Sequence, residues 1–576
     1  MRRLVILLLA GLSCLVAQSS NTALQELFKS YYEEGLRENP ERATAQGRNE
    51  YNDRWTNWSK VALDHRRRRT EEYLKRLDAF ADAPLSPQDK LSYRLLRYQL
   101  QQRLEGEDFE RYMFRVFQMS GLHTNVYSTV DLMPARNVKD YENIIARLNA
   151  IPVYVDQNLS VLDEAIARGL VQPKVVVDRV NDQLATHLTQ DAAHTPLLAA
   201  FRKFPANISK EEQSRLQEQA TAAYNNRFLP AWRKLAEYMK QTYAPKARPS
   251  VALTSVPNGK TLYAIQVRQI TTTSMTPEQI HKLGLAEVDR IEGEMQAVMR
   301  EVGFTGTVAE FDAKLDATPE LHFRTKDEML VYCRNIAKVV EPELPRLFKH
   351  LPNLLYGVRA IQADREASSA SNAQAPPPDG SRPGWFNLNT YQPEKQVRYD
   401  KESLVLHEAV PGHILQLSIA QQMHDVPEFR RSFRATAFSE GWGLYAESLG
   451  SEVGVYRDPY SRYGRLTSER FRAVRLVVDT GMHQLGWSRD EAIAYFQKHA
   501  RTASIAEIDR YIGWPGQALA YKIGELKIRE LRAKAEKELG AKFDIREFHD
   551  VVLRNGGLPL EMLEEEVNSY IAGGRS

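Results

Sequence analysis

Residues 406–416 read Leu-His-Glu-Ala-Val-Pro-Gly-His-Ile-Leu-Gln, the segment of the chain with the densest set of chemically active side chains. A His-Glu pair followed by a second His on one helix is the arrangement in which two imidazoles bind a metal ion and the adjacent carboxylate deprotonates metal-bound water. The pattern therefore predicts metal ligation by His407 and His413, with Glu408 as a general base.

The spacing of the two histidines departs from the usual four residues. Six residues, at about 100° each, place the side chains about 120° apart around a straight helix, so both rings could not reach one ion. Pro411 lacks a backbone donor and Gly412 tolerates unusual dihedral angles. We therefore expect the helix to bulge at this pair and to absorb the two extra residues.

A third ligand is available on a following helix, because residues 438–447 read Phe-Ser-Glu-Gly-Trp-Gly-Leu-Tyr-Ala-Glu. Glu440 would complete a three-ligand site with an open fourth position. Glu447 follows seven residues later on the same helix face and would orient an imidazole through its other ring nitrogen. The alternative for Glu440 is a capping or dipole role at a helix start.

Helical periodicity dominates the rest of the chain. Leu24, Leu27, Phe28 and Tyr31 form an amphipathic stripe, and a capping box at Thr276-Pro277-Glu278-Gln279 predicts a helix that runs to about Val302. The same periodicity predicts helices over 60–105, 139–170, 209–242 and 525–540.

Strand signals are few. Residues 251–256 and 262–269 flank Asn258-Gly259 and predict a hairpin, and residues 384–389 predict a further strand. Residues 363–383 are rich in Ala, Ser, Asn and Pro and predict a mobile loop. We expect a mainly α fold with two helical lobes around a cleft and a small central sheet, as one domain over residues 18–576.

Composition limits the class of protein. The 576 residues carry a net charge of +3, with 43% hydrophobic and 26% charged residues, which is typical of a globular protein and does not favour nucleic-acid binding. Met1-Arg2-Arg3, an apolar run over 4–12 and Ala17 predict a signal peptide over 1–17, because the run is too short to span a membrane. The protein is then periplasmic or secreted, and lipid attachment at Cys14 is an alternative.

After cleavage Cys333 is the remaining cysteine, so no intrachain disulfide can form. Its apolar-periodic surroundings favour a buried core thiol over a nucleophile.

These segments carry a resemblance to a known family. Residues 439–447 are similar to the segment in which gluzincin aminopeptidases place their glutamate ligand. The ordered blocks resemble a bacterial family known as domain of unknown function 885, regarded as gluzincin-like. The blocks are 276–295, 379–389, 407–416, 439–447, 475–487 and 515–524. The resemblance implies a gluzincin-like fold and a zinc peptidase. The family usually reads Pro-Gly-His-His where this chain has Ile414, so His413 must supply the ligand for the chain to be active.

Other residues are candidates for supporting roles. Arg475, Asp479 and His483 follow one another at four-residue spacing and share a helix face. His483 would donate a hydrogen bond to a developing oxyanion or bind substrate. The alternative is a core histidine that is hydrogen-bonded to Asp479. The resemblance implies a tyrosine near the metal, for which we favour Tyr521 over Tyr511.

Substrate binding has three further candidates among the basic residues. Arg510, Lys522 or Arg529 would bind a peptide's terminal carboxylate and so define a carboxypeptidase. The strand that ends at Asn389 would pair with extended substrate backbone if it lay at an exposed sheet edge.

The leading hypothesis is an exported peptidase with one zinc ion held by His407, His413 and Glu440. The alternatives are an inactive binding protein of the cell envelope, motivated by Ile414 and the ligand spacing, and a metal-dependent hydrolase of a non-peptide amide or ester. End specificity and oligomeric state have no sequence signal.

Overall fold

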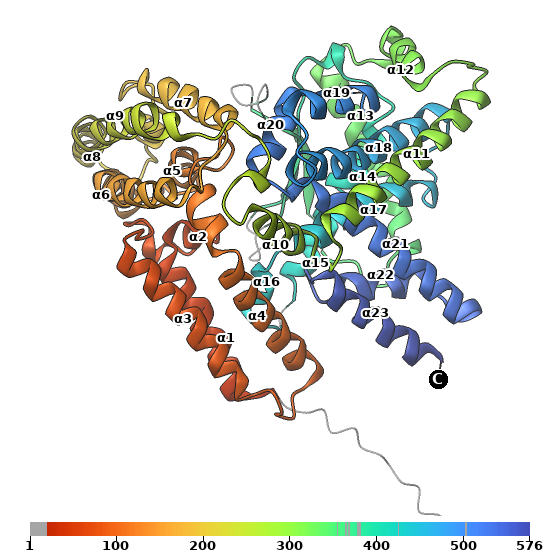
Figure 1. Cartoon of the computed structure of the whole chain (residues 1–576), viewed down its shortest axis with the longest axis horizontal. Coiled ribbons are helices and arrows are strands. Elements are labelled where there is room, and N and C mark those ends of the chain that lie inside the picture. The colour runs from red at the N-terminus through yellow and green to blue at the C-terminus, as the bar shows by residue number, and fades with distance from the viewer. Residues whose placement is uncertain are drawn as a thin grey trace, which may run out of the picture.

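The chain is mainly helical and carries one small sheet, as the prediction had it (Figure 1). The computed structural model describes residues 20–575 apart from 354, 363–365, 367–368, 377–381, 424 and 502–503. The expected signal peptide and Cys14 lie outside the described residues. No helix in the described part is long and apolar enough to cross a membrane.

The first four helices form an arm that packs on the C-terminal helices (Figure 1). Phe28 lies 5.2 Å from Phe429 between ring centroids, and Arg94 pairs with Glu565. The arm thus shares its hydrophobic core with residues from the far end of the chain. Its helices are α1 (Thr22–Glu38), α2 (Pro40–Ala45), α3 (Lys60–Asp78) and α4 (Pro87–Glu105).

The next five helices form a smaller lobe with a hydrophobic core of its own (Figure 1). Trp232 stacks on Phe228 at 4.5 Å in the middle of this core. The separate core confirms the expected division into two helical lobes. The helices are α5 (Leu122–Asp131), α6 (Val138–Arg168), α7 (Lys174–Leu188), α8 (Lys210–Ala223) and α9 (Leu229–Tyr238).

The remaining helices form the larger lobe. The expected helix start at Thr276 is confirmed, because its side chain and that of Gln279 form a reciprocal capping box. Cys333 is fully buried, as expected. The helices are α10 (Gly259–Thr271), α11 (Pro277–Glu301), α12 (Val308–Asp316), α13 (Lys326–Val340), α14 (Lys401–Glu408), α15 (His413–Gln421), α16 (Glu428–Ser432), α17 (Thr436–Ser448), α18 (Pro459–His483), α19 (Arg489–His499), α20 (Ile505–Gly513), α21 (Ala520–Leu539), α22 (Ile545–Leu553) and α23 (Leu560–Arg575).

Helices α17 and α21 approach each other at two glycines. A Cβ atom at Gly441 would lie 2.5 Å from the Gly524 backbone, and one at Gly524 would lie 1.8 Å from the Ala437 carbonyl oxygen. Neither position accepts a side chain without separating the helices. This contact places the start of α21 next to the part of α17 that carries Glu440.

The predicted hairpin over residues 251–269 is wrong. A single 3₁₀ turn covers Leu253–Ser255, and α10 begins at Gly259 directly after the left-handed Asn258. The buried residues Leu262, Tyr263 and Val267 share one helical face, so tertiary burial follows the helical period rather than alternation. Asn-Gly here forms a helix entry instead of a hairpin turn.

The sheet forms from different segments. It has the order β1-β3-β2, with β1 (Tyr356–Ala360) parallel and β2 (Asn372–Gln374) antiparallel to β3 (Gly384–Leu388). The predicted strand is confirmed as β3, whereas β2 lies inside the segment predicted as a loop. β3 is the central strand, so the expectation that it offers an exposed edge to substrate is wrong.

Candidate metal centre

The chain breaks its helix between the two histidines. The structure ends α14 at Glu408 and begins α15 at His413, so the expected bulge is replaced by a four-residue connection. Gly412 permits this turn, because a Cβ atom there would lie 2.0 Å from the His407 carbonyl oxygen. Trp442 of α17 donates a hydrogen bond of 2.9 Å to the Pro411 carbonyl and fixes the connection.

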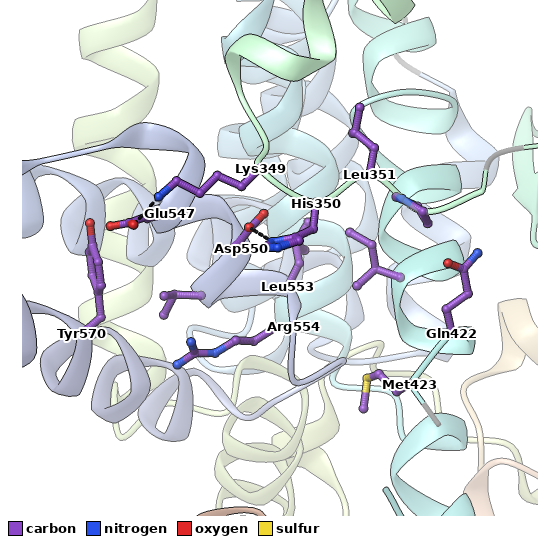
Figure 2. A pocket seen from close by; sticks show the side chains of 13 residues that line it. Lys349, His350, Leu351, Gln422, Met423, Glu547, Asp550, Leu553, Arg554 and Tyr570 are labelled. Carbon is purple, nitrogen blue, oxygen red and sulfur yellow. Dashed lines mark hydrogen bonds and ion pairs between the residues drawn. The ribbon is translucent and has the colours of Figure 1, made fainter. Parts of the chain in front are cut away.

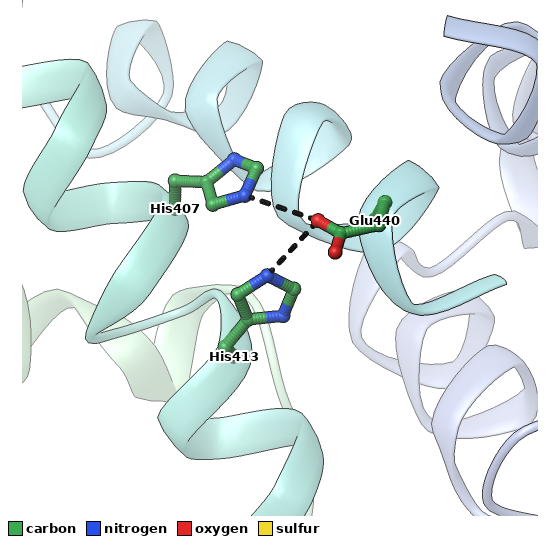
Figure 3. A group of neighbouring side chains, drawn as sticks. All are labelled: His407, His413 and Glu440. Carbon is green, nitrogen blue, oxygen red and sulfur yellow. Dashed lines mark ion pairs between the residues drawn. The ribbon is translucent and has the colours of Figure 1, made fainter. Parts of the chain in front are cut away.

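The three expected ligands converge (Figure 3). The Nε2 atoms of His407 and His413 lie 3.6 and 3.4 Å from Oε2 of Glu440. The side chain of His407 is 3% exposed, that of His413 14% and that of Glu440 22%. The cluster is therefore closed behind His407 and reaches solvent on the side of the other two residues.

Glu447 holds His407 from the opposite side of its ring. Its Oε1 atom lies 2.8 Å from Nδ1 of His407, which leaves Nε2 directed at Glu440. Tyr456 donates to the Glu447 backbone carbonyl at 2.7 Å, and Arg472 lies 3.7 Å from the Glu447 carboxylate. This is the carboxylate–histidine arrangement that fixes the tautomer of a metal-binding imidazole.

The carboxylates of Glu440 and Glu447 stabilise a positive charge on the imidazole of His407. Burial would lower the pKa of His407, but hydrogen bonds to Glu440 and Glu447 outweigh burial and raise that pKa to about 9. Burial would raise the pKa of Glu440, and hydrogen bonds with His407 and His413 instead hold it well below its usual range. The same carboxylates that retain a proton on the ring would stabilise a metal cation between the three side chains.

Glu408 lies beside this cluster with a buried carboxylate. Burial raises its pKa, while His407, His413 and Arg472 act in the opposite direction. No hydrogen-bond partner holds this carboxylate among the described residues.

Tyr521, at the start of α21, lies over the same imidazole. Its ring is nearly parallel to that of His407, at 20° and 6.4 Å between centroids. Burial and the Glu440 carboxylate raise the pKa of the Tyr521 hydroxyl, and Arg475 and Arg510 oppose them. Its position next to the ligands agrees with the preference for Tyr521 over Tyr511.

Two other expected site residues, His483 and Tyr511, have structural partners instead. His483 is fully buried; Nδ1 accepts from the Leu253 amide at 3.1 Å, and Nε2 lies 3.0 Å from the Tyr511 carbonyl oxygen. It is a core histidine, held by backbone groups rather than by Asp479. The Tyr511 hydroxyl accepts from Arg475 at 2.7 Å and donates to Glu507 at 2.6 Å.

Asn389 and Lys522 are engaged as well. The Asn389 amide donates to the carbonyls of Glu366 and Ser369 and so fastens the segment before β2. Lys522 has no exposed surface and pairs with Glu287, Glu469 and Glu525 within 3.0 Å, so it is not a substrate-binding residue. Hydrogen bonds to the preceding segment engage Asn389, and burial among carboxylates engages Lys522.

Two residues that the sequence did not single out contribute to the site. Gly443 leaves room for the His407 ring, because a Cβ atom there would lie 2.7 Å from Cε1. Arg472 lowers the pKa of Glu408 and is 17% exposed, like Arg510. Gly443 lies between Glu440 and Glu447 on the same helix, three residues after the first and four before the second. This helical spacing was the sequence signal that could have placed Gly443 at the site.

A surface groove lies away from the cluster of His407, His413 and Glu440. It has a volume of about 770 Å³ and is lined by residues 349–352, by the end of α15 and by α22 and α23 (Figure 2). His350 pairs with Asp550 at 2.6 Å, and Lys349 pairs with Glu547. Its rim charges are thus neutralised by one another, and none of the three ligands lines it.

Fold and site together define a mainly helical protein with a partly buried cluster of two imidazoles and a carboxylate, of a type suited to a divalent metal. The chain belongs to a family of bacterial proteins of unknown function, DUF885, whose model matches residues 40–567. No curated protein matches the chain.

Solved structures with the same fold exist. One, from Colwellia psychrerythraea and described as a candidate lipoprotein, is 27% identical with a TM-score of 0.91 and covers 96% of this chain and 100% of its own. A candidate lipoprotein of unknown function from Shewanella oneidensis is 16% identical with a TM-score of 0.72, covering 95% and 99%. A candidate oligoendopeptidase F from Bacillus anthracis aligns at 11% identity and a TM-score of 0.34, covering 88% and 96%, which is too low to support an inference.

Proposed function

We propose that the protein is an exported zinc-dependent peptidase. The observation that carries this proposal is the convergence of His407, His413 and Glu440 on one point, with a second carboxylate behind His407 and the carboxylate of Glu408 beside the cluster. Two imidazoles and one carboxylate are a ligand set of catalytic zinc sites, which keep a further position open. The partial exposure of His413 and Glu440 supports such an open side.

The donor set fits zinc. Glu408, Glu440 and Glu447 bring three carboxylates to a cluster whose nearest permanent cation is Arg472, so a divalent ion would compensate their charge. A bound zinc ion would supply a Lewis acid that lowers the pKa of water to about 7.

The roles of the protein's own residues follow from their positions. Glu408 would accept a proton from the attacking water and pass it to the leaving amine. The Tyr521 hydroxyl would donate a hydrogen bond to the substrate carbonyl oxygen as negative charge develops on it. Arg510 and Arg472, which are partly exposed, are available to bind a substrate carboxylate.

Export is part of the proposal. The N-terminal residues have the composition of a signal peptide, and two structural neighbours are described as candidate lipoproteins. A periplasmic or secreted location follows, and lipid attachment at Cys14 is the alternative to cleavage after Ala17.

The decisive test is Glu408→Gln in the zinc-loaded protein. We expect the variant to keep stoichiometric zinc, measured by elemental analysis, and to lose about 10²–10⁴-fold in cleavage of a mixed peptide library read by mass spectrometry. Glu320→Gln, at an exposed position, is the matched control and should cleave as the wild type does.

The other outcomes separate the competing functions. A wild-type protein without bound zinc, and without activity on zinc addition, would favour a binding protein of the envelope. Cleavage of ester or non-peptide amide substrates in the absence of peptide cleavage would favour the third hypothesis. Wild-type turnover in Glu408→Gln would reject the general base.

A further inference from the structure

A second concave site lies in the N-terminal arm, apart from the metal cluster. A cavity of about 110 Å³ is enclosed by the segment before α3, by α3 itself, by the end of α4 and by the following turn Phe109–Met113. Five arginines and one tryptophan dominate its wall. They are Trp58, Arg66, Arg67, Arg103, Arg111 and Arg115.

The charges around this cavity do not balance. Two acidic residues, Glu107 and Glu110, line it against the five arginines. Arg67 pairs with Glu107, and Arg111 lies 3.6 Å from Glu107 and 4.0 Å from Asp64. Glu71 lies 3.2 Å from Arg67 on its other side. With these four acids counted, one positive charge remains. Arg103 and Arg115 have no ion-pair partner among the described residues.

The guanidinium groups also crowd one another. Burial, assisted by the neighbouring Arg103, lowers the pKa of Arg66 to about 10, and burial lowers the pKa of Arg115. Buried N–H groups without an acceptor in the described structure include Nη2 of Arg66, Nε and Nη2 of Arg111 and Nε of Arg115. Desolvated like charges destabilise the fold unless an anion lies among them.

Contacts within the protein hold two of the arginine side chains of the cavity wall in fixed positions. Arg115 lies over the Trp58 ring with its Cζ atom 3.8 Å from the centroid, and Arg66 lies at 5.2 Å. Arg66 also donates to the Asn57 carbonyl at 2.8 Å. Planar guanidinium groups fixed in this way present paired N–H donors that match the oxygens of a phosphate.

We propose that this cavity binds a phosphate-type anion. The unpartnered N–H groups of Arg66, Arg111 and Arg115 would donate to its oxygens. The cavity volume is well below the roughly 300 Å³ at which pockets begin to hold drug-sized ligands, so it suits a small anion. The anion is either free phosphate or the phosphate monoester of a lipid headgroup, because both present the same oxygens. The site is independent of the metal cluster and of the proposed peptidase activity.

The first experiment measures phosphate binding by calorimetry on the full chain, with chloride at equal ionic strength as the reference anion. We expect saturable binding of one phosphate per chain. Arg103→Gln should weaken it at least about tenfold, because Arg103 lines the cavity without an ion-pair partner, so its replacement breaks no ion pair. Arg68→Gln is the matched control: it lies in the same run of four arginines, is exposed and does not line the cavity.

The second experiment separates the two sources of phosphate. Vesicles of phosphatidylcholine with and without phosphatidic acid are sedimented with the protein. Binding that needs both phosphatidic acid and Arg103, without binding of free phosphate, assigns the site to a lipid headgroup. Arg115→Gln provides a second variant in the cavity wall. The proposal is overturned if neither probe binds, or if Arg68→Gln weakens binding as much as Arg103→Gln does.

Discussion

Gly443 controls the distance between α17 and the buried ligand His407. A methyl group there would lie 2.7 Å from Cε1 and 2.8 Å from Nε2 of the imidazole, closer than packed carbon and nitrogen atoms allow. The ring would have to move away from Glu440. We expect Gly443→Ala to weaken zinc binding at least about tenfold, as loss of ligand orientation does. Competition with a chelator measures the change.

Gly293 of α11 provides the control for this substitution, since a Cβ atom there meets nothing within 4 Å. Gly293→Ala should leave zinc affinity unchanged and should raise the free energy of unfolding by about 0.5–1 kcal/mol through backbone entropy. Equal zinc affinity in Gly443→Ala and the wild type would show that the close approach has no bearing on the site.

The residues of the motif lie together in the structure, whereas several candidates outside it have structural partners. His407, His413 and Glu440 belong to short segments whose ligand chemistry is visible locally, and the structure brings them together. His483 offered the same chemistry in the sequence, but its ring nitrogens meet two backbone groups from distant segments. Such partners depend on which chain segments meet, which spacing along one helix does not reveal.

Asp479 links α18 to α10 and to the turn before α21. It accepts hydrogen bonds from the Tyr263 hydroxyl at 2.7 Å and from the Gly516 amide at 3.0 Å. Burial raises its pKa to about 7, although both hydrogen bonds oppose the shift. The carboxyl group is therefore protonated in the folded protein at a pH where it is ionised in the unfolded chain.

This difference makes stability depend on pH. As pH rises from about 4 to about 7, the unfolded chain loses its proton first, so the wild type loses stability that it holds fully below pH 4. Asp479→Asn keeps both hydrogen bonds without the ionisation. Its free energy of unfolding should exceed that of the wild type by on the order of 4 kcal/mol above pH 7 and match it below pH 4. Denaturant unfolding across this range measures the difference.

Asp82→Asn, at an exposed position, should follow the wild-type curve at every pH. A constant offset between Asp479→Asn and the wild type, independent of pH, would contradict a protonated Asp479.

Among the larger elements, helices were predicted better than strands. The capping box of α11 is contained in four consecutive residues, so its start was visible in the sequence. Residues 259–271 have apolar positions compatible with either a strand or a helix, and burial on one face of α10 settles the choice. The sequence predicted the strand β3 but not its central position in the sheet. That position depends on pairing with β1 and β2, which are separated from β3 along the chain.

The smaller lobe has a hydrophobic core separate from the two clusters of the larger lobe, and the ligand residues belong to the larger lobe. Zinc that binds only the folded larger lobe stabilises it by about 2.7 kcal/mol at a free concentration a hundred times the dissociation constant. We expect two transitions in scanning calorimetry, and chelation should lower the temperature of one of them. A single transition, or an equal shift of both, would show that the lobes unfold as one unit.

Local sequence was enough to establish a mainly helical protein and the residues of the proposed metal site, because helix caps, amphipathic spacing and ligand chemistry act over a few residues. Tertiary structure alone revealed the break between α14 and α15, the helix in place of a hairpin and the arginine-lined cavity. The physical reason is that burial and charge balance depend on contacts between segments far apart in the chain. Arg66 and Arg103 meet around one cavity only after α3 and α4 pack.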